Sequence, residues 1–235
     1  MTQTYRLHYA PDNASLIIRL ALEELGLSYE TSLVDRRSRA QDGAAYRRLN
    51  PNGLIPVLET PDGPMFETAA ILLWLADRHG ALAPEAISPE RAAFLKWLFF
   101  ASNTLHADLR MSFYPEKYIG SDPSHHAALR AGLRERLKAH LGHLDDLASQ
   151  DLSWFGAETP SALDYYIAPM LRWMALYPEQ GDRSWYDLST YPHLHALLSK
   201  LESRPAVHAA IKAEGLGETP FTKPLPANPP EGSAT

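Results

Sequence analysis

The sequence has 235 residues, a hydrophobic fraction of 45%, a charged fraction of 21% and a formal net charge of −6. These values are typical of a globular protein with one large or two modest domains, and they disfavour a nucleic-acid partner, which requires a basic face. No segment approaches the ~18–20 uninterrupted apolar residues of a membrane span, so we expect no membrane association. The start of the chain lacks the pattern of a secretory signal and no cysteine occurs, so we expect a cytoplasmic protein.

The first part of the chain has a β-α-β pattern. Residues 5–9 alternate apolar and polar side chains, as a short strand does. From Ser15 the apolar residues fall at helical spacing as far as Gly26, which ends the helix, and either Asn13 or Ser15 stands at the N-cap position. Residues 28–34 form a second predicted strand, which we expect to pair with the first in parallel.

A short helix, a hairpin and a longer helix are predicted next. Residues 42–49 are a helix candidate, and residues 55–58 are an apolar strand that carries a proline near its start. The Asp-Gly pair at 62–63 predicts a hairpin turn into a returning strand at 65–66. Helical spacing then runs over residues 68–80.

Strand patterns stop after this point and helical patterns continue, which indicates two segregated structural units. The predicted helices of the second unit cover about residues 90–117, 123–149, 161–176 and 191–212. We therefore expect a first domain over 1–82, a helical domain over 88–220 and a tail over 221–235. The tail is rich in proline, glycine and small polar residues, so we expect it to be extended or disordered.

Two stretches of the first domain resemble one protein family. Residues 50–58 (NPNGLIPVL) resemble the N-P-x-G-x-I/V-P-x-L stretch of the cytosolic glutathione transferases, and residues 66–71 (FETAAI) resemble their L/F-E/D-S/T-x-A-I stretch. The resemblance covers roughly residues 4–215. It implies an α/β thioredoxin-like N-terminal domain (βαβαββα), an all-α helical C-terminal domain, glutathione as co-substrate and no metal.

The same two stretches imply most of the glutathione contacts. In the family the proline at position 56 is cis, and the backbone beside Leu54 and Ile55 pairs with the extended ligand as a short strand would. Glu67 is expected to accept a hydrogen bond from the ligand's ammonium group. Thr68, at a helix N-terminus, is expected to hold the γ-glutamyl carboxylate through its hydroxyl and backbone N–H.

The residue that activates the thiol is implied by a third stretch. Residues 9–16 (YAPDNASL) resemble the Y-x-P-x-x-C-S-L segment of bacterial beta-class members, but Ala14 stands where that class has its cysteine. This departure removes mixed-disulfide chemistry through the protein. A hydrogen-bond donor near the helix must then lower the thiol pKa from its usual ~8.5. Ser15 is the first choice for this donor, Asn13 the second and Tyr9 the third.

Three further residues are assigned by position. The L-H pair that ends at His106, followed by F-Y-P at 113–115, resembles the L-H-x-x-F-x-P pattern of the beta class, with a longer spacing here. In that class the histidine faces the glutathione sulfur. Asn103, one turn earlier, is a candidate for contact with the ligand or the subunit interface, and Arg39 is a candidate for contact with the glycine carboxylate of glutathione.

Two other patterns have structural explanations. Ser161 and Asp164 form the S-x-x-D signature of a helix capping box, and we assign them to folding. Arg36, Arg37 and Arg39 form a basic cluster that is either a solvated loop or a local anion site.

The combined patterns predict a glutathione transferase that adds the glutathione thiolate to a small apolar electrophile, acts in detoxification and forms a homodimer. Two alternatives stay open. One is a glutathione-dependent disulfide reductase. The other is a non-catalytic binding protein with the same fold, which the absence of the cysteine would permit.

Overall fold

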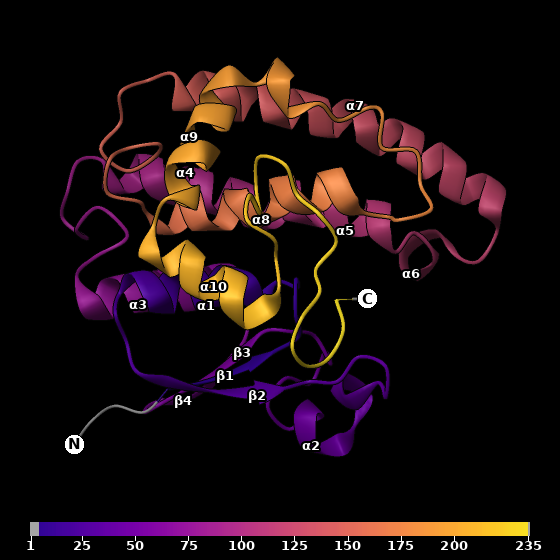
Figure 1. The fold of residues 1–235 in the computed structure, drawn as a ribbon, viewed down its shortest axis with the longest axis horizontal. Coiled ribbons are helices and arrows are strands. Elements are labelled where there is room, and N and C mark those ends of the chain that lie inside the picture. Colours follow the sequence, from indigo (N-terminus) through magenta and orange to yellow (C-terminus); the bar gives the residue numbers. More distant parts are fainter. Residues whose placement is uncertain (1–4, 235) are drawn as a thin grey trace.

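The computed structural model describes residues 5–234, which form a small α/β domain followed by a larger helical domain (Figure 1). Residues 1–4 of the expected first domain and residue 235 of the expected tail lie outside the described residues. In chain order, the elements are β1 (Tyr5–Tyr9), α1 (Ser15–Glu24), β2 (Tyr29–Leu33), the 3-10 turn η1 (Ala40–Asp42), α2 (Ala44–Arg47), β3 (Val57–Thr60), β4 (Gly63–Met65), α3 (Thr68–His79), α4 (Arg91–Phe100), the π turn η2 (Ala101–Leu105), α5 (His106–Phe113), α6 (Glu116–Ile119), α7 (Pro123–Ala148), α8 (Ala162–Leu176), the 3-10 turn η3 (Leu188–Thr190), α9 (Pro192–Glu202) and α10 (Pro205–Glu214).

The sheet has the strand order β2-β1-β3-β4. β1 pairs with β2 in parallel, while the β1–β3 and β3–β4 pairs are antiparallel. Leu7 of β1 and Leu58 of β3 lie opposite each other in the middle of the sheet, and both are fully buried. The predicted β-α-β unit and fold class are confirmed. The hairpin is also present, but its strands lie at Val57–Thr60 and Gly63–Met65 and not at the predicted 55–58 and 65–66.

Helix α1 lies between the sheet and the helical domain. Its residues from Ser15 to Leu22 are all buried, and it packs against α3, α8 and α10 (Figure 1). The prediction that Asn13 or Ser15 caps this helix is wrong, because Ala14 occupies the N-cap position and no side chain caps it. The start of α1 therefore keeps backbone N–H groups that no capping side chain covers, at the positive end of the helix dipole.

Two of the four predicted helices of the second domain are confirmed and two are wrong as single helices. The helices predicted over 123–149 and 161–176 correspond to α7 and α8, and α8 begins with the predicted capping box. The segment predicted over 90–117 is divided into α4, η2, α5 and α6. The segment predicted over 191–212 is divided into α9 and α10, because Pro205 has no N–H to continue a helix and instead begins α10.

One hydrophobic core runs through both domains. It joins Tyr5 and Leu16 of the first domain to Leu98 and Leu163 of the helical domain, and each of these side chains is almost completely buried. The domain limits at 82 and 88 stay a prediction, since the core is continuous across them.

The segment that follows α10 has no helix or strand and folds back over the molecule towards the sheet domain (Figure 1). Phe221 is buried, and the Glu202 carboxylate accepts the backbone N–H groups of Phe221 and Thr222 at 2.8 Å. Gly215 begins the segment at φ +63°, where an added Cβ would clash with the Asn228 carbonyl oxygen. The segment is thus held by specific contacts, although it has no regular secondary structure.

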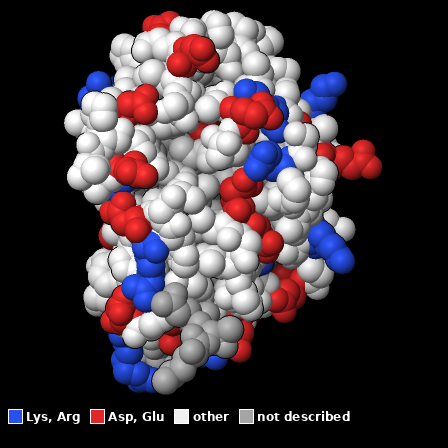
Figure 2. Space-filling view, turned by 90° about the vertical axis from the view of Figure 1, so that its left-hand side faces the viewer, with Lys and Arg blue, Asp and Glu red and all other residues white. Residues whose placement is uncertain are grey.

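No helix within residues 5–234 combines the length and the apolar character needed to cross a membrane. On the face of the molecule shown in Figure 2, acidic and basic side chains are scattered over a mostly uncharged surface, and in places they lie side by side.

Candidate active site

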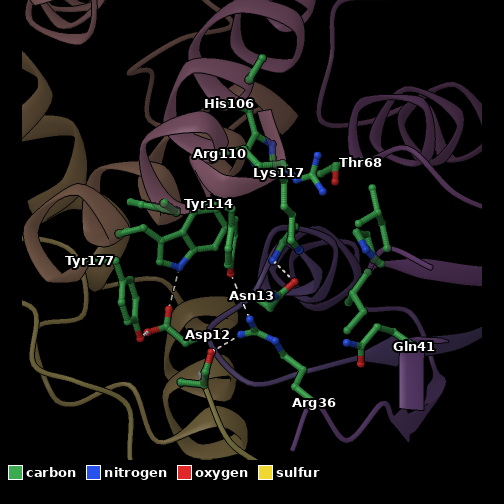
Figure 3. Close-up of a pocket in the computed structure, with 18 of the residues that line it drawn as sticks. Asp12, Asn13, Arg36, Gln41, Thr68, His106, Arg110, Tyr114, Lys117 and Tyr177 are labelled. Carbon is green, nitrogen blue, oxygen red and sulfur yellow. Dashed lines mark hydrogen bonds between the residues drawn. The ribbon is translucent and has the colours of Figure 1, made fainter. Parts of the chain in front are cut away.

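A cavity of about 830 Å³ lies between the sheet domain and the helical domain. It is lined on one side by the loops that follow β1 and β2, by the loop before β3 and by the start of α3. On the other side it is lined by η2, α5, α6 and α8, and by the end of the tail (Figure 3). The volume lies in the upper part of the range for small-molecule sites, roughly 300–1,000 Å³.

The loop before β3 presents backbone to the cavity. Leu54, Ile55 and Pro56 line it, and the Ile55–Pro56 peptide bond is cis. The Leu54 carbonyl accepts hydrogen bonds from the Tyr46 hydroxyl and the Asn50 amide, each at 2.8 Å, which fixes the loop. Because β3 begins only after Pro56, the backbone of Ile55 lies outside the sheet ladder and is available to an extended ligand.

The start of α3 combines an acidic side chain with a helix N-terminus. Glu67 has φ +71°, in the left-handed region that non-glycine residues rarely adopt, and lines the cavity. Thr68 follows as the first residue of α3, is 7% exposed and lines the cavity as well. A carboxylate of a ligand can therefore meet the Thr68 hydroxyl and the positive end of the helix, with the Glu67 carboxylate next to it.

Of the three candidate thiol activators, only Asn13 lines the cavity (Figure 3). Its Oδ1 accepts the N–H of Ala14 at 2.8 Å. Since a backbone N–H can only donate, this bond fixes the amide orientation and leaves the Asn13 NH2 group as a donor at the start of α1.

Ser15 and Tyr9 lie away from the cavity. Ser15 is fully buried, and its hydroxyl donates to the Ala10 carbonyl at 3.0 Å and accepts the Ala10 N–H at 3.2 Å. Tyr9 is 3% exposed and its hydroxyl donates to Glu231, while burial raises its pKa. Because Ala10 engages the serine hydroxyl and Ser15 does not line the cavity, the geometry favours Asn13 over Ser15 as the donor to the thiol, and the identity of this donor stays a prediction.

His106 lies in the cavity wall directly after the π turn. Its Nδ1 lies 3.0 Å from the Tyr166 hydroxyl, and its ring packs against Trp173 at a centroid distance of 6.0 Å. Burial, together with the smaller effect of the nearby charge of Arg110, lowers the pKa of His106 to about 4. The ring is therefore neutral at physiological pH. Asn103, also proposed from the sequence, is exposed and lies outside the cavity lining.

The basic cluster contributes a different arginine from the one expected. Arg39 is exposed, pairs with Asp42 at 2.7 Å and does not line the cavity. Arg36 does line it, donating to the Ala234 carbonyl at 2.5 Å and to the Tyr114 hydroxyl at 3.0 Å (Figure 3). Nearby, Gln41 places in the wall a buried amide oxygen that has no hydrogen-bond partner among the described residues.

Sequence reasoning missed the residue that fixes the floor of the cavity. Asp12 is buried with φ +48°, and it accepts hydrogen bonds from Arg172, from the Trp173 indole at 2.8 Å and from the Tyr177 hydroxyl at 3.1 Å (Figure 3). Its backbone N–H donates to Glu214 at 2.8 Å. The available signal was Arg172 itself, a charge inside the apolar run of residues 167–176, since a buried arginine requires a carboxylate partner.

Comparison with known proteins identifies the family. Residues 14–78 match the family model of the glutathione S-transferase N-terminal domain, and residues 127–199 match that of the glutathione S-transferase C-terminal domain. A solved structure of a sphingomonad glutathione S-transferase complexed with glutathione is 34% identical, covers 90% of this chain and 100% of its own, and superposes with a TM-score of 0.73. The chain belongs to the glutathione S-transferase family.

Two curated relatives bear different names. A glutathione S-transferase of Xanthomonas campestris is 28% identical over 219 residues, which cover 90% of this chain and 99% of the relative. The disulfide-bond oxidoreductase YfcG of Escherichia coli is also 28% identical over 219 residues, which cover 90% of this chain and 96% of the relative. Both activities therefore occur among proteins similar to this glutathione S-transferase.

In this glutathione S-transferase the cavity brings together most of the residues proposed from the sequence. Those that line it are Asn13, Leu54, Ile55, Pro56, Glu67, Thr68 and His106. Those that lie elsewhere are Tyr9, Ser15, Arg39 and Asn103. Within residues 5–234 no group of three or more His, Cys, Asp or Glu side chains is arranged to hold a metal ion.

Proposed function

We propose that this chain is a glutathione transferase that holds glutathione against the sheet domain and an electrophile against the helical domain. The observation that carries the proposal is the convergence of Asn13, Ile55, Glu67 and Thr68 on one side of a single cavity. These groups match the charges and the extended backbone of glutathione.

Each polar part of glutathione has a complementary group. The ammonium group meets Glu67, and the γ-glutamyl carboxylate meets Thr68 and the N-terminus of α3. The backbone of Ile55 pairs with the peptide, as in strand addition. The glycine carboxylate is assigned to Arg36, which replaces Arg39 in this role, and the unpaired amide oxygen of Gln41 can accept a peptide N–H.

The thiol is placed at the start of α1. The Asn13 NH2 group donates to the sulfur, and the helix dipole adds a positive potential, so the thiolate is favoured and its pKa falls below ~8.5. His106 faces the same space as a neutral ring. The thiolate then attacks the electrophile, forming a C–S bond while the leaving group departs with its electron pair.

The electrophile lies against aromatic side chains. Phe113, Tyr114, Trp173 and Tyr177 line the helical-domain side of the cavity and offer apolar surface to a small apolar electrophile, which suits a role in detoxification.

Calorimetric titration with glutathione, combined with thiolate absorbance across pH, tests the proposal. Wild type is expected to bind glutathione and to lower its thiol pKa, while Asn13→Ala binds it with a thiol pKa close to the free value. Ser15→Ala is the matched control, because it removes a donor in the first turn of α1 that does not line the cavity. Absence of binding at millimolar glutathione would leave the non-catalytic alternative.

The disulfide reductase is the second candidate, and its support is the similarity to YfcG together with a cavity large enough for more than one peptide. Turnover of a glutathione mixed disulfide that exceeds turnover of 1-chloro-2,4-dinitrobenzene would favour this activity.

We further propose a cytoplasmic homodimer. Phe99 of α4 is 44% exposed, which a subunit interface would cover. Analytical ultracentrifugation of wild type and Phe99→Glu tests the dimer, because only the variant is expected to sediment as a monomer. Cell fractionation tests the location.

A further inference from the structure

The helical-domain wall of the cavity carries two cations that glutathione does not use. They are Arg110 of α5 and Lys117 of α6, and both line the cavity (Figure 3). Arg110 donates to the Tyr118 hydroxyl at 2.7 Å, and the Lys117 ammonium lies 4.6 Å from the centre of the Tyr114 ring. Among the described residues, neither has a carboxylate within 4.0 Å.

The charges of glutathione are already matched by other groups. Glutathione has two carboxylates and one ammonium group, and the proposed function assigns these to the N-terminus of α3, Arg36 and Glu67. The remaining acidic side chains in the lining are Asp12, which forms a fully buried ion pair with Arg172, and Glu179 at the edge of the cavity. Arg110 and Lys117 are therefore a positive charge in excess of what glutathione requires.

Aromatic rings stand beside both cations. Arg110 and Phe113 lie one turn apart on α5, and the Tyr114 ring lies under Lys117. A ligand held here meets apolar surface and positive charge at once, which suits an aromatic ring that bears an anionic substituent. Arg110 also lies close enough to His106 for its charge to lower the pKa of that ring, so both side chains belong to the same wall of the cavity.

We propose that the electrophile of this enzyme is an aromatic compound that carries a carboxylate, with Arg110 and Lys117 as its specificity-determining residues. The inference rests on the proposed function and narrows its substrate class. In the reaction with 4-chloro-3-nitrobenzoate, the thiolate forms a C–S bond at the carbon that bears chlorine, and chloride leaves with the electron pair. The carboxylate takes no part in bond making and serves only for binding.

The test compares 4-chloro-3-nitrobenzoate with its methyl ester, which has the same ring and leaving group without the charge. Arg110→Met and Lys117→Met are each expected to lower kcat/KM for the acid by about tenfold, the worth of one charged hydrogen bond. For the ester, both variants are expected to stay within about twofold of wild type. Lys212→Met is the matched control, because it removes an exposed lysine of α10 outside the cavity.

A binding measurement keeps the inference testable without turnover. Wild type is expected to bind the glutathione conjugate of the acid about tenfold more tightly than the conjugate of the ester, and both variants to lose that preference. Equal binding of the two conjugates by wild type, or an equal loss of kcat/KM for acid and ester in the variants, would overturn the inference. If glutathione itself still binds unchanged, the proposed function remains intact. Calorimetry can also show two glutathione molecules bound per chain of wild type and only one in each variant. In that case Arg110 and Lys117 bind the second glutathione, and the proposal of a carboxylate-bearing electrophile is overturned.

Discussion

Asp12 and Arg172 form a two-pronged ion pair whose side chains are both completely buried, with Nε–Oδ1 and Nη2–Oδ2 distances of 2.9 and 3.0 Å. The remaining donors of Arg172 reach the carbonyls of Leu216, Pro220 and Leu225. One arginine thus connects the loop after β1 to the tail, and the pair fixes the cavity floor.

Asp12→Asn is expected to lower the free energy of unfolding by about 3–5 kcal/mol, because it leaves the Arg172 charge buried without a counter-charge. Chemical denaturation measures the loss. The matched control is Glu135→Gln, which breaks the exposed Lys138–Glu135 pair and is expected to cost no more than about 1 kcal/mol. Equal losses in the two variants would contradict this role of the buried pair.

The fold is expected to become less stable as the pH is lowered, because His106 is buried in its neutral form. Above pH 6.5 the ring is neutral in both states, whereas between 6.5 and about 4 only the unfolded chain takes up the proton. The free energy of unfolding therefore decreases as the pH falls through this window, by about 3 kcal/mol for a pKa shift of this size. Denaturation of wild type and His106→Gln at pH 7 and pH 4.5 measures the difference, with the exposed His208→Gln as control. Parallel losses in all three proteins would refute the assignment.

A chain that ends at Asn228 is expected to keep its fold and to bind glutathione about fivefold more weakly. The shortened chain retains every carbonyl that Arg172 uses, but Arg36 loses the Ala234 carbonyl and Tyr9 loses Glu231. Loss of one orienting hydrogen bond is worth about 1 kcal/mol. Calorimetry measures glutathione affinity for the full-length and shortened chains, each with and without Arg36→Met. Once Arg36 is replaced, the truncation should not weaken glutathione binding further. Additive losses would show that the tail does not act through Arg36.

Ser161→Ala is expected to lower the free energy of unfolding by about 1–2 kcal/mol. Its hydroxyl accepts the Leu163 N–H at 3.1 Å, and Asp164 accepts the Ser161 N–H at 2.7 Å, so the substitution removes half of a buried capping box. Thermal denaturation measures the effect. Ser199→Ala, on the exposed side of α9, should leave the midpoint almost unchanged, and a similar shift in both variants would argue against the cap.

The strands, the hairpin and the capping box could be predicted because each depends on residues close together in the sequence. Alternation, an Asp-Gly pair and a serine three residues before an aspartate act locally. The predictions of single helices over 90–117 and 191–212 were wrong for reasons that are also local. Pro205 was visible in the sequence, whereas the π turn η2 has no side-chain signature.

Which side chains of a stretch enter the cavity was harder to predict. The π turn changes the helical phase, so that His106 faces the cavity and Asn103 faces solvent. In the basic cluster, loop geometry places Arg36 inside and turns Arg39, at φ +56°, outward. Ser15 was expected in the cavity but is buried beside it, because the first position of α1 points into the protein interior and not into the cavity. Such choices depend on backbone dihedral angles that the residue types do not determine.

The contacts between the start of the chain and its last third have a consequence for how the molecule is made. Asp12 and Glu214 are separated by 202 positions, and Tyr9 and Glu231 by 222. Synthesis runs from the N-terminus, so the loop after β1 leaves the ribosome long before its partners exist. Arg19 of α1 pairs with Glu214 at 2.7 Å. Until Arg172 and Glu214 have been synthesised, the Asp12 carboxylate and the Arg19 guanidinium stay in water, because burying either without its partner would be costly. Products that terminate before Glu214 therefore lack the partner of the Asp12 N–H and of Arg19, and we expect them to lack the folded floor of the cavity.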